Sequence, residues 1–399
     1  MLGQKGRTVR LGLWSVVKLW SAAACSRVAL WRRTSHGTAL VLAAAIFAVT
    51  FNSQAFAQRC TVFAPCPPVP AVNGAVNGDV YASSQAGLFD IGSHFQNRLG
   101  ALSSYRTAAS RGNNPQGGGA DLAVDPTYDR YRTWFEGYGI NTTTDAQGSF
   151  LGDRRKMYGG LAGAGMTVTP GVTLGVSVDR NTTDIDVPGA NGRIDMTQIG
   201  ALGSLEKGPW TLGITVIHGF GDVNSSRFDS GGTSTAAYHA RLWGTMAELS
   251  YYVALPDNWR FVPRLTFDWV RSRTDAFVET GGTNPISGSP VTANRIRMLA
   301  GGEIGRTWLV GRQIFDFAIY ARLVDNLAQN IGDLVINDTS VVTAPQFIAG
   351  VRESTLGADA GATFSIKVSQ VARLYAVYDG RFRSNLTSHG GTVGAEFRW

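Results

Sequence analysis

The residues that could support catalysis are few and scattered along the chain. After residue 57 there are four histidines, His94, His218, His239 and His389, and each lies in a separate segment. Neither a serine elbow nor a paired carboxylate accompanies them, whereas nucleophilic catalysis needs a nucleophile, a base and an orienting acid within hydrogen-bond reach. The sequence therefore predicts no enzymatic activity, no bound cofactor and no metal site.

Charged side chains in the second half of the chain alternate with apolar ones. Phe315, Phe317 and Ile319 form one face of a period-two pattern, while Asp316 and Arg322 lie on the other. This period is typical of a β-strand with two different faces. Nine charges are expected on the polar faces of such strands: Arg264, Asp268, Asp316, Arg322, Arg373, Asp379, Arg381, Glu396 and Arg398.

These charges, together with Glu136, Glu248 and Glu303, have two interpretations. The carboxylates could face one another like the pair of an aspartic protease, or they could belong to a hydrated interior crossed by salt bridges. Burying both signs of charge at every second position of a dry core carries a large desolvation cost. A membrane barrel avoids that cost by turning its apolar face to lipid and its charged face to a lumen, which favours the second interpretation.

Twelve segments show this alternation, and the gaps between them differ regularly in length. Connections after even-numbered segments are tight, as at Pro170 and Gly171, whereas those after segments 1, 3, 5, 7 and 9 are long and polar, as at 224–235 and 274–292. A membrane meander with short periplasmic turns and long outer loops has this arrangement. The expected strands cover residues 130–141, 155–168, 171–183, 192–206, 209–222, 236–254, 258–274, 293–308, 311–328, 353–367, 370–384 and 388–399.

Lipid offers no partner for the free backbone groups at the edge of a sheet, so the first and last segments must pair. The sequence thus predicts an all-β fold, a closed antiparallel 12-stranded transmembrane β-barrel over residues 130–399. Most of the seven tryptophans after residue 57 lie near segment ends, where interfacial aromatic belts occur. We expect a monomeric barrel in contact with outer-membrane lipid.

The first 57 residues have the plan of a secretory signal peptide. They contain seven basic and no acidic residues, followed by an apolar run at 39–51 and an A-x-A motif at Ala55 and Ala57. Cleavage before Gln58 is expected, although Cys60 leaves a lipoprotein signal as the alternative. Removing this segment leaves 29 basic and 29 acidic residues. The high isoelectric point is therefore no evidence for nucleic-acid binding.

Three segments separate the signal peptide from the barrel. Residues 58–78 form a short tail, in which Cys60 and Cys66 suit a small disulfide loop in an oxidising compartment. Residues 79–104 have helical periodicity, and a helix of that length, at about 1.5 Å per residue, is able to thread the ~30 Å hydrocarbon thickness of a bilayer. An ordinary surface helix would show the same pattern. Residues 105–129 are glycine-rich and are expected to be a flexible connector.

The first predicted strand and the predicted helix each resemble a part of the autotransporter β-domain family. Trp134, Gly137, Tyr138 and Gly139 look like the opening strand of that domain. The stretch from Asn77 onwards is similar to the linker helix that plugs the family's pore. The resemblance implies that the helix of residues 79–104 lies inside the barrel, with its apolar residues in the pore: Tyr81, Leu88, Phe95 and Leu99.

The C-terminal alternation supports the same resemblance. Val393, Ala395, Phe397 and Trp399 resemble the terminal signal read by the barrel-assembly machinery, usually closed by Phe and here by Trp. The family implies export to the periplasm of a Gram-negative cell, periplasmic chaperones and a type V secretion translocator exposed at the cell surface. Its usual large passenger is here reduced to residues 58–78. The alternatives are an outer-membrane channel, a structural or adhesive surface barrel and, last, an outer-membrane hydrolase.

Overall fold

The computed structural model describes residues 78–112, 130–229, 231–311, 313–332, 334–338, 346–348 and 350–399. The cleavage residues Ala55, Ala57 and Gln58 and the cysteines Cys60 and Cys66 lie outside this part of the chain, so their roles stay predictions. No helix among the described residues is both long and apolar enough to cross a bilayer.

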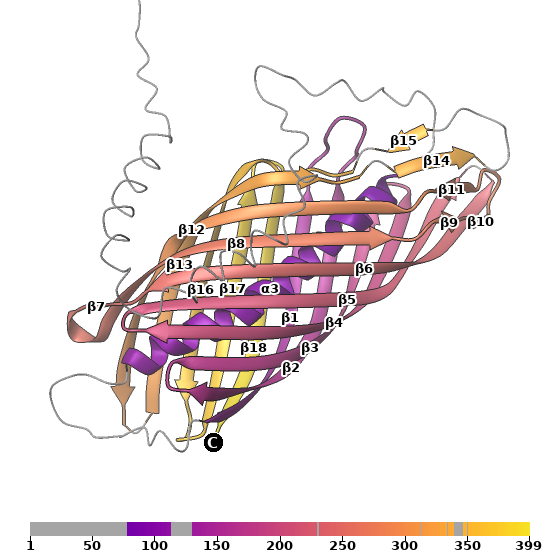
Figure 1. The fold of residues 1–399 in the computed structure, drawn as a ribbon. Coiled ribbons are helices and arrows are strands. Elements are labelled where there is room, and N and C mark those ends of the chain that lie inside the picture. The colour runs from indigo at the N-terminus through magenta and orange to yellow at the C-terminus, as the bar shows by residue number, and fades with distance from the viewer. Residues whose placement is uncertain are drawn as a thin grey trace, which may run out of the picture. The chain divides into compact units, whose positions relative to one another are not determined.

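Twelve long antiparallel strands form a closed barrel within the described residues (Figure 1). Each strand pairs with its neighbours along the chain, and the ring closes where β1 pairs with β18, from Arg132 opposite Arg398 to Thr144 opposite Leu386. The predicted fold class is confirmed. The strands are β1 (Tyr131–Thr144), β2 (Asp153–Thr169), β3 (Val172–Val187), β4 (Ala190–Lys207), β5 (Trp210–Asp229), β6 (Gly232–Tyr251), β8 (Trp259–Thr274), β12 (Val291–Val310), β13 (Gln313–Asn330), β16 (Leu356–Lys367), β17 (Ala372–Arg383) and β18 (Leu386–Arg398).

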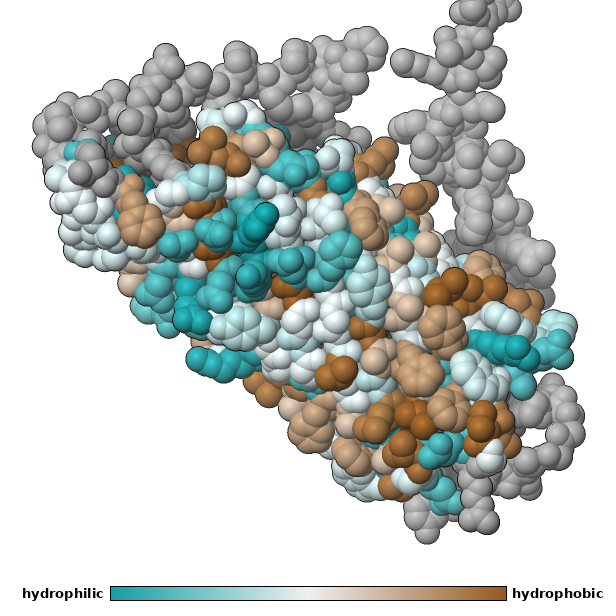
Figure 2. Space-filling view, turned by 180° about the vertical axis from the view of Figure 1, so that it is seen from behind, coloured by the Kyte–Doolittle hydropathy of each residue, from teal (hydrophilic) through white to brown (hydrophobic). Residues whose placement is uncertain are grey.

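The outer surface of the barrel carries the apolar residues and the interior carries the polar ones. In β13, Phe317, Ile319 and Leu323 are 42%, 49% and 73% exposed, whereas Asp316 and Ala318 are 4% and 2% exposed. On the face turned away from the viewer in Figure 1, apolar side chains gather toward one end of the barrel and hydrophilic ones toward the other (Figure 2). The apolar part is the surface that suits lipid, and the strands continue beyond it into a polar surface.

Two outer connections expected to be long are instead short hairpin turns. β3 ends at Val187 and β4 begins at Ala190, while β5 ends at Asp229 and β6 begins at Gly232. The polar residues expected to form those loops extend the strands. Where a strand leaves the membrane, its outer face contacts water and no longer needs apolar residues. Such a strand is polar on its outer face, so its composition is similar to that of a loop. The prediction of long loops after the third and fifth segments is therefore wrong.

Tight turns at the opposite end of the barrel depend on glycine. Gly171, Gly208 and Gly311 have φ angles of 82°, 57° and 64°. These left-handed conformations carry no steric penalty only for a residue without a β-carbon. This end also holds Tyr131 and Trp399, whose backbone groups exchange two hydrogen bonds of 2.8 and 3.0 Å. We call it the inner end, and the end with the long connections the outer end.

The two longest outer connections build a second, smaller sheet. It contains β9 (Phe277–Val278) and β11 (Ile286–Gly288) from one connection and β14 (Leu334–Asp338) and β15 (Gln346–Ile348) from the other. Two short strands extend the sheet of the barrel itself. β7 (Val253–Ala254) pairs with β8 at one end, and β10 (Thr280–Gly281) pairs with β6 at the other. A single 3₁₀ turn, η3 (Pro256–Asn258), precedes β8.

A helix, α3 (Asp79–Gly112), runs through the barrel (Figure 1). It begins at the outer end, where Tyr81 stacks on Phe277 of β9 at 4.2 Å between ring centroids. It is eight residues longer than the range 79–104 that the apolar periodicity indicated. Apolar spacing stops at Leu102, but helical backbone hydrogen bonds do not require apolar side chains, so the periodicity underestimates the length of the helix.

Candidate functional site: the occupied lumen

An apolar seam holds α3 against one wall of the barrel. Leu88, Phe95 and Leu99, three of the residues expected in the pore, are completely buried. They belong to the same apolar cluster as Ile194 of β4 and Leu242 of β6. Each buried Leu or Phe side chain stabilises the packed state by about 1.5–3 kcal/mol. The seam therefore contributes substantially to the stability of the seated helix.

Glycines on the facing strands allow the helix to come this close. A β-carbon at Gly200 would lie 2.6 Å from Cδ1 of Leu99 and 2.9 Å from Cε1 of Phe95. A β-carbon at Gly244 would lie 2.5 Å from Nε2 of Gln96. A larger residue at Gly200 would have to displace the packed side chains of Leu99 and Phe95, whereas at Gly244 the flexible end of Gln96 is what would have to move.

The opposite side of α3 is charged, and one anchor joins it to the first barrel strand. Arg98 donates through Nε and Nη2 to the two carboxylate oxygens of Glu136, both at 2.8 Å. The hydroxyl of Tyr375 donates to the same carboxylate at 2.6 Å. Because Arg98 and Glu136 are each 5% exposed, this bidentate pair lies in a low-dielectric site where a lone charge would be costly.

A second anchor lies two helical turns closer to the outer end. Asp90 accepts a hydrogen bond of 2.7 Å from Nη1 of Arg381 on β17. Its other oxygen lies 3.2 Å from Nη2 of Arg155 on β2. The two anchors together fix both the depth and the rotation of the helix, because they connect it to strands on both sides of the closure between β1 and β18.

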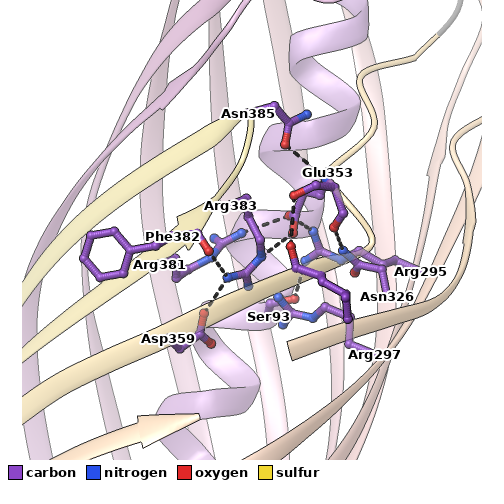
Figure 3. Close-up of polar contacts among 12 residues, drawn as sticks. Ser93, Arg295, Arg297, Asn326, Glu353, Asp359, Arg381, Phe382, Arg383 and Asn385 are labelled. Carbon is purple, nitrogen blue, oxygen red and sulfur yellow. Dashed lines mark hydrogen bonds and ion pairs between the residues drawn. The ribbon is translucent and has the colours of Figure 1, made fainter. Parts of the chain in front are cut away.

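The connection between β15 and β16 folds into the lumen and reinforces this anchor (Figure 3). Arg295 of β12 donates to the carbonyl of Phe89 at 3.1 Å and to Oγ of Ser93 at 2.7 Å. Glu353 of the connection pairs with Arg295 and accepts from Nη2 of Arg381 at 2.9 Å. Glu353 therefore joins the two arginines that hold successive turns of the helix.

The segment around Glu353 is fixed by its own hydrogen bonds. Asn326 donates to the carbonyl of Ser354 at 2.7 Å, and Asn385 donates to the carbonyl of Arg352 at 2.7 Å. Burial opposes ionisation of Glu353, but the guanidinium groups of Arg295 and Arg381 outweigh it and hold the pKa of this carboxyl well below its usual range. The carboxylate is therefore charged at physiological pH.

Aromatic and charged residues hold the start of α3 at the outer end. The hydroxyl of Tyr81 donates to Oε1 of Glu279 at 2.7 Å, and Arg227 donates to Oε2 of the same residue at 2.7 Å. One turn further on, Gln85 donates to Thr274 at 2.8 Å and accepts from Ser272. The fourth expected pore residue, Tyr81, thus lies at the outer mouth of the lumen.

The charges expected in the lumen lie on the inner face of the barrel and are engaged by opposite charges or by a hydroxyl. None of the carboxylates Glu136, Glu248 and Glu303 is paired with another carboxylate, because each has an arginine within 3.6 Å. The contacts of the predicted residues are Arg264 with Glu303 and Glu248, Asp268 with Arg297, Asp316 with Arg260, Arg322 with Asp359, both Arg373 and Arg398 with Glu396, Arg381 with Asp90 and Asp379 with Tyr320.

Sequence reasoning missed several partners of these charges. Arg295 and Arg297 flank a register shift of β12, where Ile296 between them is also buried, so the strict alternation that would have marked them is interrupted. Glu353 lies in a connection without periodicity. Arg260 and Asp359 do alternate with apolar neighbours and were detectable by the same pattern as Arg264.

A cavity of about 120 Å³ remains between α3 and the barrel wall, and both charged and apolar side chains line it. His94 and Asn97 of the helix line it, together with Glu248, Arg322 and Tyr375 of the strands. The volume holds several water molecules. The helix therefore fills most of the lumen but leaves a water-sized space beside His94 and Asn97.

The residues of the two terminal motifs meet at the barrel closure. Trp134 is completely buried in the interior, and the hydroxyl of Tyr138 donates to Asp179 at 2.7 Å. Nothing lies within 4 Å of a β-carbon built on the outward-facing Gly137 or Gly139. Val393 and Phe397 of β18 are 64% and 40% exposed on the outer surface, Ala395 is half-buried, and Trp399, the residue after the strand, is 50% exposed.

Comparison with known proteins agrees with this architecture. Residues 133–379 match the model of the autotransporter β-domain family. The translocator domain of the autotransporter NalP from Neisseria meningitidis is similar in structure, with a TM-score of 0.63 and 16% sequence identity over 81% of this chain and 100% of that one. The β-domain of the Bordetella autotransporter BrkA has a TM-score of 0.53 and 15% identity over 68% of this chain and 100% of that one.

At these identities the two structures establish the fold, and the family match establishes the relationship. No curated protein sequence matches the chain. The family match spans most of the barrel, from the opening strand to β17. The chain is an outer-membrane translocator barrel of type V secretion and belongs to the autotransporter β-domain family.

Proposed function

We propose that this barrel presents its own short N-terminal segment, residues 58–78, at the cell surface and then remains closed by α3. In this proposal the signal peptide of residues 1–57 directs export, periplasmic chaperones keep the chain unfolded, and the barrel-assembly machinery inserts it. Residues 113–129 connect α3 to β1. The protein has no catalytic role.

The observation that carries the proposal is the seated helix. α3 is attached by an apolar seam and by the ion pairs of Arg98 and Asp90, and it begins at the outer end beside Glu279. In this proposal the segment that precedes residue 78 leaves the barrel at the outer end, which the position of Tyr81 supports. Because the charges on α3 face matching charges on the strands, the helix suits a stable closed state better than a transient passage.

Conductance in planar bilayers tests the closed state. We expect the wild-type barrel to remain nearly silent and a variant lacking residues 79–104 to conduct continuously. Heat-modifiable migration on a gel verifies that both form closed barrels. N97A is the matched control, because Asn97 is a half-buried helix residue lining the cavity. Continuous conductance of the wild type would instead support the channel alternative, which the cavity of about 120 Å³ beside the helix favours.

Proteolysis of intact cells tests the orientation. A protease added outside should cut in the long connections at 274–292 or 329–352 and spare the turns at Pro170 and Pro256. Cleavage at either turn in intact cells would reverse the orientation and refute surface presentation. A tag inserted between residues 66 and 78 should be accessible to antibody without permeabilisation.

A further inference from the structure

Three arginines gather on the outer surface of the barrel, on two neighbouring strands. Arg241 of β6 lies directly opposite Arg273 of β8 in the antiparallel register, and Arg271 lies two residues before Arg273. All three side chains are exposed. We call these residues the arginine patch. Directly opposite residues of an antiparallel pair, such as Arg241 and Arg273, have β-carbons about 4.5–5.5 Å apart, and diagonal neighbours, such as Arg241 and Arg271, lie about 7–8 Å apart, so all three side chains can reach one ligand.

No carboxylate among the described residues forms an ion pair with the arginine patch, although the interior arginines of the same strands are paired. Arg264 pairs with Glu303, for example. The outward-facing carboxylate of Asp222 on β5 instead lies 2.7 Å from Nδ1 of His239. Like charges directly opposite one another destabilise a sheet. The arrangement therefore indicates an anion from outside the chain.

The arginine patch lies at the outer boundary of the apolar surface. On the lipid-facing side of each strand, a tryptophan lies one position closer to the inner end than the arginine. Trp243 is the neighbour of Arg241 on β6, and Trp269 is the neighbour of Arg271 on β8. Trp243 is 51% exposed and lies opposite Arg271. Tryptophans of a membrane barrel mark the level of the interface, and the next outward residues lie among the lipid headgroups.

We infer that Arg241, Arg271 and Arg273 bind the phosphate groups of a phosphorylated glycolipid in the outer leaflet. A guanidinium group binds phosphate through two parallel hydrogen bonds, and three groups at one level can share two phosphates of the same headgroup. The adjacent exposed Trp243 offers an apolar surface to the acyl chains of the same lipid. This site is independent of the helix and of the closed or open state of the lumen.

The binding of purified lipid A to the folded full-length barrel tests this inference. Bound lipid is measured by native mass spectrometry across a titration of bisphosphorylated lipid A, with lipid A lacking both phosphates as the chemical control. The triple variant R241Q/R271Q/R273Q is compared with wild type. R306Q is the matched control, because Arg306 is an exposed arginine at the inner end, beside the ring of Trp259. Heat-modifiable migration verifies folding of every variant.

We expect about a 100-fold weaker affinity of the triple variant for bisphosphorylated lipid A, about fivefold per arginine. R306Q should bind like wild type, and the dephosphorylated lipid should bind both equally weakly. Equal affinity of the triple variant and wild type would overturn the inference. Inorganic phosphate at millimolar concentration should not displace the lipid; full displacement would also overturn it, since the site would then be one for free phosphate.

Discussion

Arg98 of α3 and Glu136 of β1 form a bidentate ion pair inside the barrel, with both nitrogen–oxygen distances at 2.8 Å. The pair connects the helix to the strand that closes the barrel with β18. Removing one buried partner leaves the other charge without compensation, which costs about 3–5 kcal/mol. The seated position of the helix is therefore sensitive to single substitutions at this pair.

We expect R98A to raise the open probability of the pore at least tenfold, because Glu136 keeps a buried charge and the helix loses one anchor. Single-barrel recordings measure the open probability. The double variant R98Q/E136Q should conduct less than R98A, since it leaves no isolated charge. Equal, silent traces for R98A and N97A would show that the pair does not hold the helix.

Enlarging Gly200 should displace the helix by overpacking. We expect G200V to weaken the seating of α3 by about 1–3 kcal/mol, because even a β-carbon there would lie 2.6 Å from Leu99. The displaced helix should open the pore and, in a background that carries N97C, react faster with a thiol label at that position. G203A on the same strand is the control, since its β-carbon would meet Leu174 at an ordinary 3.5 Å. If both variants label at the same low rate, the groove tolerates larger residues than the structure implies.

The Glu353 contacts should give a pH-dependent contribution to stability. A carboxyl whose folded pKa is depressed stabilises the folded state fully above its unfolded pKa of about 4.3 and loses that contribution as pH falls through the folded pKa. The difference in thermal unfolding temperature between wild type and E353Q should thus be constant from pH 8 to about pH 5. Below about pH 4 it should shrink. A difference that already shrinks near pH 6 would mean that the arginines do not lower this pKa.

The last residue should matter through its backbone rather than its ring. Deleting Trp399 removes the two backbone hydrogen bonds to Tyr131, each contributing about 0.5–1.5 kcal/mol. We expect a lower temperature for the heat-modifiable transition and a smaller folded fraction in cells. W399F keeps both bonds and an aromatic end, so it should match wild type. Failure of W399F to assemble would indicate that the indole itself is recognised.

The barrel could be predicted from the sequence because the alternation of apolar and polar residues is a property of each strand by itself. Alternation such as that around Phe317 marks a strand wherever lipid lies on one side and the lumen on the other. Outside the membrane the rule stops working, since the residues of β5 beyond Asp222 meet water on their outer face and were therefore predicted to form a loop. The helix was recognisable for the same reason, from the spacing of Leu88, Phe95 and Leu99.

The internal contacts could not be predicted, since they depend on which strands face one another across the lumen. Nothing in the sequence joins Asp90 to Arg381, which lies 291 residues further along the chain. Glu353 lacked any periodic neighbours, and the register shift in β12 concealed Arg295 and Arg297. Charge alternation identified which residues point inward but not their partners.

Because β5 and β6 extend beyond the lipid, much of the surface that this barrel exposes outside the cell consists of paired β-strands rather than loops. Backbone pairing and inward contacts such as that of Arg227 with Glu279 hold this rim, so substitutions of its outward-facing side chains should leave its outline unchanged. Immune recognition directed at those side chains would be escaped by substitution, whereas the scaffold beneath them would persist.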